Sequence, residues 1–436
     1  MTADGPIDVR EELATAAVGP LHKGLCALIA ILTFFDGYGT FNPSYVIHYV
    51  AGPWGLSLAQ SGLLVSSGLF GFLIGAATHG LVADAYGRRG TLLGGLWIAS
   101  AFTLSTALFG NSFAAFCVTR VFTGVGLGVL LPLSTTYIAE LAPRAVAHTF
   151  AVWGVALGWA AGGAFAGIAG VWLTPIYGWK VLYWVGTLSV PLALVLHLVL
   201  PESPKFLMEK GRVAELRQLL ARLRPERADL YRQRVLGGAV PSAGGGSIAT
   251  LFSGPYGALT PRLWTAAFLS LFCIYGLSGW IPTVMMKRGE TFAASFGYGA
   301  LIQAMSFAGG LTCGHLADRY RASRIGLTVW WATGGLAVLA LIAFNNHLVN
   351  LAAVAAAGFF VVGAQFVLNN VAAASYETGV RATGVGMMLS VGRIGAVIGP
   401  YVAGTLQQTS LGPSVMFCAI GLAALGAAAV IATVPE

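Results

Sequence analysis

Charged residues are scarce in this chain of 436 residues. Asp, Glu, Lys and Arg make up only 9% of it, whereas hydrophobic residues make up 57%, and the mean hydropathy is +0.78. A soluble globular chain carries about 25% charged residues, so the composition predicts an all-α integral membrane protein. The net charge of +8 does not point to a nucleic-acid partner, because the basic residues gather in loops on one side of the expected spans.

The sequence also lacks the constellations of a catalytic or metal site. Its five cysteines are odd in number, lie in apolar stretches and show no metal-ligand spacing, so we expect them to be small packing residues. No P-loop, no metal-binding cluster and no catalytic Ser or Cys arrangement stands out. We therefore expect no enzyme activity, no cofactor and no metal.

Long apolar runs are what the chain has in abundance. Hydropathy predicts twelve transmembrane helices, because a helix needs roughly 20 apolar residues to cross a bilayer. The predicted spans lie near residues 24–50, 58–83, 90–109, 112–138, 147–172, 179–200, 260–285, 293–317, 325–344, 348–372, 382–407 and 411–433.

The largest hydrophilic gap follows the sixth span and divides the chain into two halves. We expect four parts, namely a tail over 1–23, a six-helix bundle over 24–200, a linker over 201–259 and a second six-helix bundle over 260–436. Apolar residues at helical spacing predict one short interfacial helix in Pro204–Leu223. The glycines of Gly237–Gly246 predict a flexible tether.

Lys and Arg set the expected orientation. Of the 24 basic residues, Arg120 and Arg393 fall within spans and Lys180, Lys287 and Arg288 lie on one side, so the other 19 share the opposite side. The positive-inside rule makes that side the cytoplasm, together with both termini. The tail carries acids and lacks the pattern of a signal peptide. We expect a monomer in the plasma membrane, the bacterial inner membrane, surrounded by lipid.

The two halves are related in sequence. The segment Gly80–Asp84 recurs as Gly314–Asp318, and the same shift along the chain lays Gly158 on Gly392. We call this shift, from Gly80 to Gly314, the repeat offset. Two six-helix halves related about an axis normal to the membrane are typical of the major facilitator fold, in which the substrate site lies at the midplane between the halves.

A loop between the second and third spans carries the strongest local motif. It reads Gly80-x-x-x-Asp84-x-x-Gly87-Arg88-Arg89 and resembles the signature loop of the major facilitator superfamily. Its glycines allow a tight turn, and its arginines can bridge to acids of neighbouring helices. The resemblance implies a gating role, with a purely topological role as the alternative. The further residues expected at the gate are Glu140, Arg144, Asp318, Arg319 and Arg381.

Three charged residues fall at mid-membrane depth, namely Asp36, Arg120 and Arg393. An ionised Asp there costs at least roughly 2.5–3.5 kcal/mol, so it needs a partner, a water-filled cavity or a proton. Arg393 is flanked by glycines and suits a carboxylate bidentately. The alternative is that it forms only an ion pair with Asp36. For Arg120 the alternative to a buried role is snorkelling to the outer edge.

Six segments together resemble the aromatic acid:proton symporters of the major facilitator superfamily. They are Asp36-Gly37-Tyr38, the Arg120 motif, Pro201–Leu207, Tyr275 with Trp280–Thr283, Gly363–Gln365 and Arg381–Pro400. The resemblance covers nearly all twelve spans. It departs at Gly39, where the first span of the family usually has a second Asp.

The resemblance implies a proton-coupled symporter that imports an organic monocarboxylate, such as a benzoate or hydroxybenzoate, by alternating access. Its partners would be protons and the small organic acid. It assigns Asp36 and Arg120 to proton coupling, with Arg120 as the partner of Asp36 or as part of the proton route. The expected substrate-binding residues are Arg393, Tyr38, Trp280, Gln365, Tyr275 and Asn369.

Other functions are less compatible with the residues. A proton-antiporting exporter of drugs or metabolites usually has a proline beside a glycine in the fifth span, which is absent here. A sugar or polyol symporter is supported only by Pro201–Leu207 and opposed by Arg393. A membrane-embedded enzyme or receptor would need a catalytic constellation or a large extramembrane domain, and neither is visible.

Overall fold

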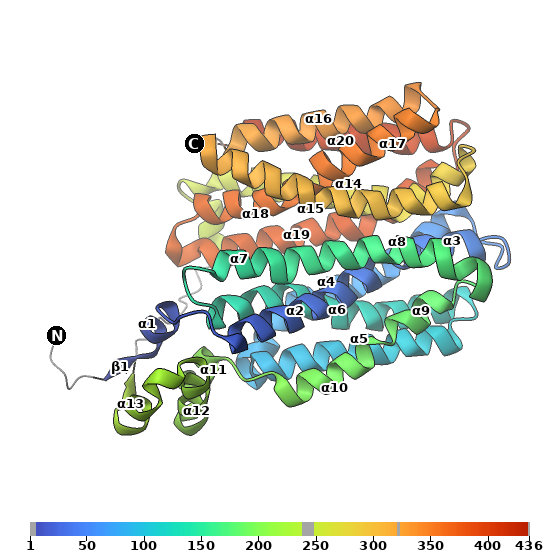
Figure 1. Cartoon of the computed structure of the whole chain (residues 1–436). Helices are drawn as coiled ribbons and strands as arrows, with labels where there is room; N and C mark the ends of the chain where they lie inside the picture. The colour runs from blue at the N-terminus through green and yellow to red at the C-terminus, as the bar shows by residue number, and fades with distance from the viewer. Residues whose placement is uncertain (1–5, 238–247, 321–322, 435–436) are drawn as a thin grey trace.

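The computed structural model describes residues 6–237, 248–320 and 323–434, and within them the chain is almost entirely helical (Figure 1). The first half of the bundle contains α2 (Pro20–Phe41), α3 (Pro43–Val50), α4 (Leu58–Tyr86), α5 (Arg88–Phe109), α6 (Phe113–Leu141), α7 (Ala147–Ala151), the π-helical turn η1 (Val152–Ala156), α8 (Leu157–Tyr177), α9 (Val181–Gly186) and α10 (Ser189–Val199). The second half contains η3 (Ile248–Phe252), α14 (Tyr256–Lys287), α15 (Phe292–Tyr320), α16 (Ser323–Ala343), α17 (His347–Ala356), the π-helical turn η4 (Ala357–Val362), α18 (Gly363–Ser375), α19 (Thr378–Leu406) and α20 (Pro413–Ala432).

Each predicted span coincides with a helical segment of this list. Among the described residues, 11 segments are long and apolar enough to cross a membrane. The remaining long helix, α15, has 29 residues and packs along α8 of the first half. Figure 1 shows the second half above the first, with the long helices running side by side.

Glycines bring the helices of the first half into backbone contact. On α6, Gly124 and Gly128 face α4, where a Cβ would stand 1.9 Å from the Gly68 carbonyl oxygen and 2.2 Å from that of Phe72. Gly126 faces α5 instead. Residues four apart share a face of a helix and a residue two away points to the other side, so the alternating glycines serve two neighbours at once.

The same crossings recur in the second half at the repeat offset. A Cβ on Gly75 would stand 2.1 Å from the Val125 carbonyl oxygen, and one on Gly309 would stand 1.9 Å from that of Phe359. Both members of the second pair follow those of the first by the shift that relates Gly80 to Gly314. The internal repeat is therefore a repeat of helix packing, in which small residues let backbones approach.

The linker between the halves folds on one face of the first half, which we name the linker face. It holds α11 (Pro204–Glu209), α12 (Val213–Leu223), the 3₁₀ turn η2 (Pro225–Arg227), α13 (Ala228–Gln233) and the strand β2 (Leu236–Gly237). The prediction of one helix was wrong, because Gly211 adopts a φ of 67° and separates α11 from α12. Apart from Gly237, the predicted tether lies outside the described residues.

The N-terminal segment is held to this linker. Strand β1 (Ile7–Asp8) pairs in parallel with β2, and α1 (Val9–Ala14) follows it. Glu12 accepts hydrogen bonds from Arg224 at 2.9 Å, Arg227 at 2.6 Å and Tyr231 at 2.7 Å. The chain start and the linker thus form one folded unit attached to the first half.

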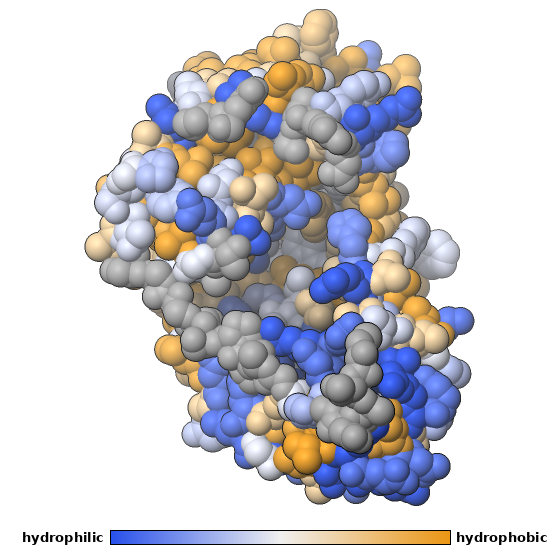
Figure 2. Space-filling view, turned by 90° about the vertical axis from the view of Figure 1, so that its left-hand side faces the viewer, coloured by the Kyte–Doolittle hydropathy of each residue, from blue (hydrophilic) through white to orange (hydrophobic). Residues whose placement is uncertain are grey.

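The linker face is hollowed between the two halves. Figure 2 views this face and shows a deep depression between the upper and lower parts of the molecule, rimmed by hydrophilic residues. At the opposite face the halves touch closely. A Cβ on Gly62 of α4 would stand 2.3 Å from the Pro400 carbonyl oxygen of α19, and one on Gly404 of α19 would stand 2.3 Å from the Leu58 carbonyl oxygen. The space between the halves is therefore open on the linker face.

Candidate functional site

Asp36 lies in the C-terminal part of α2, near the middle of the span Pro20–Val50 that α2 and α3 form together, and is fully buried, with 0% of its surface exposed. Neither of its carboxyl oxygens has a hydrogen-bond partner within the described part of the chain. Beside it, Gly37 lets α2 approach α8 so closely that a Cβ would stand 2.0 Å from the Trp159 carbonyl oxygen. The cation that acts on Asp36 electrostatically is Arg393. A buried carboxylate without hydrogen bonds is costly, so Asp36 is a candidate functional group.

Arg393 reaches from the second half to the first. It lies on α19 and is half-buried, and its Nη1 donates to the Tyr275 hydroxyl of α14 at 3.0 Å. Its guanidinium carbon stands 4.2 Å from the centre of the Phe72 ring on α4. A guanidinium has five N–H donors, and one hydrogen bond is found for this one among the described residues. Donors therefore remain for a carboxylate ligand.

A row of aromatic rings crosses from the first half to the second beside this arginine. The Trp159 ring meets the Phe41 ring edge-on at 5.0 Å, and Phe41 stacks on Tyr275 at 6.0 Å with an interplanar angle of 13°. Gln303 of α15 adjoins Phe41 at Gly163, since a Cβ there would meet both side chains. Its Oε1 and the Trp159 Nε1 are buried without partners within the described residues.

Of the residues expected to bind substrate, the structure brings Arg393 and Tyr275 together. The polar groups of Tyr38 and Trp280 form hydrogen bonds with other parts of the chain. The Tyr38 hydroxyl donates to the Leu182 carbonyl at 2.6 Å within the first half. Trp280 is fully buried, and its Nε1 donates to the Pro400 carbonyl at 2.8 Å. In this structure the polar atoms of Tyr38 and Trp280 are therefore hydrogen-bonded to backbone carbonyls.

The remaining amides form a pair on α18. Gln365 Nε2 donates to Asn369 Oδ1 at 3.1 Å, while the Gln365 Oε1 is buried without a partner in the described residues. The sequence did not single out Phe41 and Phe72 as site residues. An aromatic ring in an apolar span resembles any core residue, so nothing in the sequence could have distinguished them.

Arg120 is buried, with 2% of its surface exposed, and does not pair with Asp36. It forms no ion pair with any acid of the described residues; instead its Nη2 donates to the Gly39 carbonyl of α2 at 2.8 Å. In a helix that carbonyl would accept from the N–H four residues on, but that residue is Pro43, which has no N–H. Arg120 thus supplies the hydrogen-bond donor that the α2–α3 joint lacks. The alternative prediction, that Arg120 snorkels to the outer edge of the membrane, is wrong because its side chain is buried.

The predicted gate motif forms an ion-pair cluster at the linker face of the first half. Arg88 is buried and pairs with Asp84 at 3.1 Å and with Glu140 of α6 at 3.4 Å. Ser203, which begins α11, also donates to Glu140. The expected bridges between arginines and acids of neighbouring helices are therefore present. Gly80 is exposed and has open space around it.

The second arginine of the motif ties α5 to the end of α10. Arg89 Nε donates to the Leu200 carbonyl at 2.7 Å, and its backbone N–H donates to Glu202 at 3.0 Å. Gly87, with a φ of 91°, makes room for this acid, because a Cβ there would stand 2.2 Å from Glu202 Oε2.

Within the described residues, the other predicted gate residues form fewer hydrogen bonds and ion pairs than Arg88 and Arg89 do. Arg144 follows α6, and its backbone N–H donates to the Ala14 carbonyl at 3.0 Å. Arg381 is exposed and donates to the Tyr376 carbonyl at 3.2 Å. Arg319 is exposed beside Tyr320, and the side chain of Asp318 lies outside the described residues.

Comparison with known proteins identifies the family. The family model described as Major Facilitator Superfamily matches residues 27–400. The chain belongs to the major facilitator superfamily. It is a membrane transporter of this superfamily and not an enzyme, as the sequence predicted.

Several relatives within the superfamily are named as transporters of aromatic acids. A gallate transporter of Pseudomonas putida is 33% identical over 98% of this chain and 94% of its own length. A 4-hydroxybenzoate transporter, PcaK, of Pseudomonas aeruginosa is 30% identical over 92% of this chain and 89% of its own. A benzoate transport protein of Acinetobacter baylyi is 27% identical over 96% of this chain and 91% of its own. The predicted relation to aromatic acid transporters is confirmed.

Solved structures of the superfamily share the fold. A partially occluded inward-open structure of the xylose transporter XylE from E. coli has a TM-score of 0.74 with 17% sequence identity, covering 96% of this chain and 99% of its own. An inward-open structure of the same transporter has a TM-score of 0.73 with 16% identity, covering 93% and 95%. The predicted major facilitator fold is confirmed.

Proposed function

We propose that this major facilitator is a proton-coupled symporter that imports an aromatic monocarboxylate, such as a benzoate or hydroxybenzoate. We place it as a monomer in the plasma membrane, the bacterial inner membrane, with the linker face and both termini in the cytoplasm. The excess of Lys and Arg on that side supports this orientation. The hollow of Figure 2 would then open to the cytoplasm.

The observation that carries the proposal is the half-buried Arg393 beside the row of rings. Its spare N–H donors suit the two oxygens of a carboxylate, and Trp159, Phe41 and Tyr275 offer ring faces and edges to an aromatic substrate. Gln365 and Asn369 remain as amides for substituents of the ring. A sugar would leave the guanidinium without an anion.

Asp36 is proposed as the proton carrier. It has no hydrogen-bond partner among the described residues and feels the charge of Arg393. A proton on Asp36 would remove its attraction for Arg393 and leave the guanidinium to the substrate. One anion carried with one proton moves no net charge, so the step avoids the roughly 2.3 kcal/mol per charge that 100 mV would impose.

The ion-pair cluster around Arg88 and Glu140 is proposed as part of the gate. All of its described members belong to the first half or the linker, so it does not join the halves in this conformation. Asp84, Gly80 and Arg381 are exposed, which leaves them accessible for new contacts when closure of the hollow brings the halves together. Arg120 would contribute to coupling by holding the joint that follows Asp36.

Ligand binding by the purified protein tests the proposal. Wild type should be stabilised in a thermal-shift titration by 4-hydroxybenzoate and not by 4-hydroxybenzyl alcohol, which lacks the carboxylate. Arg393→Gln should weaken binding of the acid at least about thirtyfold, since losing one partner of a buried charge pair costs about 2–5 kcal/mol. Arg319→Gln, an exposed arginine of the same half, is the matched control. Wild-type affinity in Arg393→Gln would show that Arg393 is structural.

A further inference from the structure

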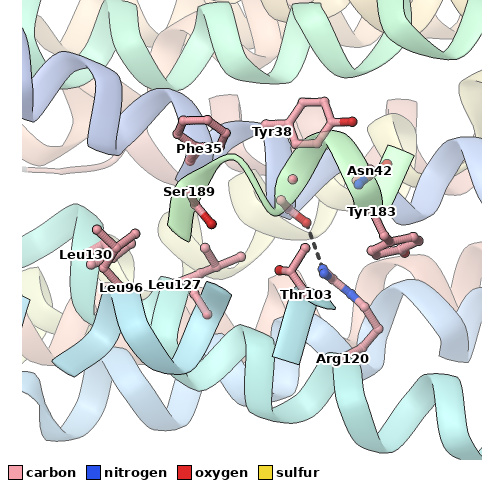
Figure 3. Close-up of a pocket in the computed structure, with 13 residues that line it drawn as sticks. Phe35, Tyr38, Asn42, Leu96, Thr103, Arg120, Leu127, Leu130, Tyr183 and Ser189 are labelled. Atoms are coloured by element: carbon pink, nitrogen blue, oxygen red, sulfur yellow. Dashed lines mark hydrogen bonds between the residues drawn. The ribbon is translucent and has the colours of Figure 1, made fainter. Parts of the chain in front are cut away.

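A second polar cavity lies inside the first half, apart from the row of rings. It is lined by residues of α2, α5, α6, α9 and α10 and of the α2–α3 joint, among them Tyr38, Asn42, Thr103, Arg120 and Tyr183. Figure 3 shows the Arg120 guanidinium extending toward α2, with its bond to the Gly39 carbonyl dashed and Thr103 and Tyr183 on either side. The free volume is about 10 Å³, close to what one water molecule needs.

The cavity holds a positive charge that the protein does not balance. Arg120 is permanently charged and 2% exposed, and no acid of the described residues lies within ion-pair distance of it. Asp36, although it is on α2, is influenced by Arg393 rather than by Arg120. The dipole of the Gly39 carbonyl offsets only part of the charge, and a buried charge without a counter-charge is strongly destabilising.

Two residues of the cavity lining carry unused hydrogen-bond donors. The Arg120 Nε and the Tyr183 hydroxyl are both buried without partners among the described residues. Native proteins rarely leave buried donors unpaired, so two such donors around one cavity indicate an occupant that accepts hydrogen bonds. Asn42 Oδ1 is a third unpartnered atom of the lining; it is an acceptor and so contributes nothing to holding an anion.

Gly39 provides the room for this occupant. It lines the cavity, and a Cβ at this position would meet nothing but the Leu127 side chain, at 3.1 Å from its Cδ1. Any side chain with a carboxylate at residue 39 would stand beside Arg120 and supply the missing charge. Glycine supplies none and leaves the space empty of protein atoms.

We propose that this cavity binds a small monovalent inorganic anion of the size of chloride, held by Arg120 Nε and the Tyr183 hydroxyl. The ion neutralises Arg120 and so stabilises the α2–α3 joint that follows Asp36. Chloride is larger than water, and the flexible end of Leu127 can move to admit it. The site is separate from Arg393 and does not depend on which substrate is carried.

Thermal stability in chloride and in gluconate tests the site, because gluconate is too large for the cavity. Wild type should melt at a higher temperature as chloride replaces gluconate at constant ionic strength. Gly39→Asp should lose this dependence, since its carboxylate takes the place and the charge of the ion. Gly39→Asn, which fills the same room without a charge, should lose the dependence as well and should melt at a lower temperature than Gly39→Asp. Tyr183→Phe should raise the chloride concentration at half-effect about tenfold, through the loss of one hydrogen bond to a charged group.

The alternatives give different results. A melting temperature that is equal in chloride and gluconate means that the cavity holds water, and overturns the proposal. A chloride effect that survives Gly39→Asp but disappears in Arg393→Gln places the ion at the substrate site and also overturns it. If Gly39→Asp does not fold, bromide-soaked crystals of wild type decide, because the proposal requires an anomalous peak between Arg120 and Tyr183.

Discussion

The two halves of the transporter share their packing but differ in charge. At the repeat offset, Asp36 of α2 corresponds to Ser270 of α14, and Arg393 of α19 corresponds to Trp159 of the fifth span. Gly158 packs against Thr33, and its counterpart Gly392 packs against Ala267, which is the counterpart of Thr33. The backbone crossings are therefore repeated while the side chains between the halves are not.

This difference shows which features the scaffold requires and which the function requires. Close crossings stabilise each half separately, so both halves keep small residues at them. Asp36 and Arg393 lie on opposite halves, and the corresponding positions in the other half hold a hydroxyl and an indole. The proposed site is thus complete only where the two halves meet.

The largest expected effect comes from replacing Asp36, whereas replacing its counterpart Ser270 should have little effect. Asp36→Asn should abolish proton-driven accumulation of 4-hydroxybenzoate in proteoliposomes while retaining exchange of bound substrate, because only the titratable group is lost. Ser270→Ala, at the equivalent buried position, should accumulate substrate almost as wild type does. Undiminished acid-stimulated uptake by Asp36→Asn would remove Asp36 from the coupling mechanism.

An intermediate effect is expected at the gate loop, where the halves also differ. Gly87 adopts φ 91° and ψ 161°, a conformation that costs other residues about 1–3 kcal/mol, and its Cβ would displace Glu202. Gly87→Ala should lower the melting temperature and slow transport. Gly90→Ala, where a Cβ meets open space, is the matched control. Equal melting temperatures and transport rates in the two variants would show that the conformation of Gly87 does not matter for stability or transport.

The halves also differ at the face opposite the linker. There the first half packs aromatic rings, with Trp54 at 6.0 Å from Phe116 and 6.1 Å from Trp179. The second half instead builds a hydrogen-bonded cluster on Glu290, which accepts from Asn350 at 2.7 Å and from Tyr298 at 3.0 Å. One side of this face is therefore apolar and the other depends on a carboxylate.

The smallest effect is a loss of stability in acid that is confined to the second half. Burial alone would raise the pKa of Glu290, but hydrogen bonds from Asn350, His347 and Tyr298 lower that pKa below its ordinary value of 4.5. The stability that ionised Glu290 contributes is fully present above the ordinary pKa, and it is lost as the pH falls through the lowered pKa of the folded protein. As the pH falls through that range, the protection factors of the amides over 288–298, corrected for intrinsic exchange at each pH, should fall, whereas those over 51–58 should not.

Two controls complete this test. In Glu290→Gln the protection factors over 288–298 should no longer change with pH, because the titrating group is gone. An equal acid response of both segments in wild type would mean that the loosening is global and does not come from Glu290.

The sequence predicted the depth of each residue in the membrane but not the direction in which its side chain points. Hydropathy and the basic residues placed the twelve spans within a few residues, and glycine spacing indicated close crossings. Tyr38, Trp280 and Arg120 lie within the predicted spans, yet their polar groups bind the carbonyls of Leu182, Pro400 and Gly39. Rotation about a helix axis depends on tertiary packing, which a single sequence does not contain.

Local backbone chemistry explains two further differences. Pro43 withholds an N–H from Gly39, and only the structure shows that Arg120 supplies the replacement. Gly211 interrupts a helical pattern with a positive φ, which apolar spacing alone does not detect. In both cases the residue was visible in the sequence, but its partner or conformation was not.

The folded N-terminal segment has a practical consequence. Because β1 and Glu12 attach the start of the chain to the linker and hence to the first half, a fluorophore placed there travels with that half. The end of α20 travels with the second half, and Figure 1 places β1 and the end of α20 toward the same side of the molecule. Energy transfer between dyes on the two termini would therefore report the angle between the halves during a transport cycle.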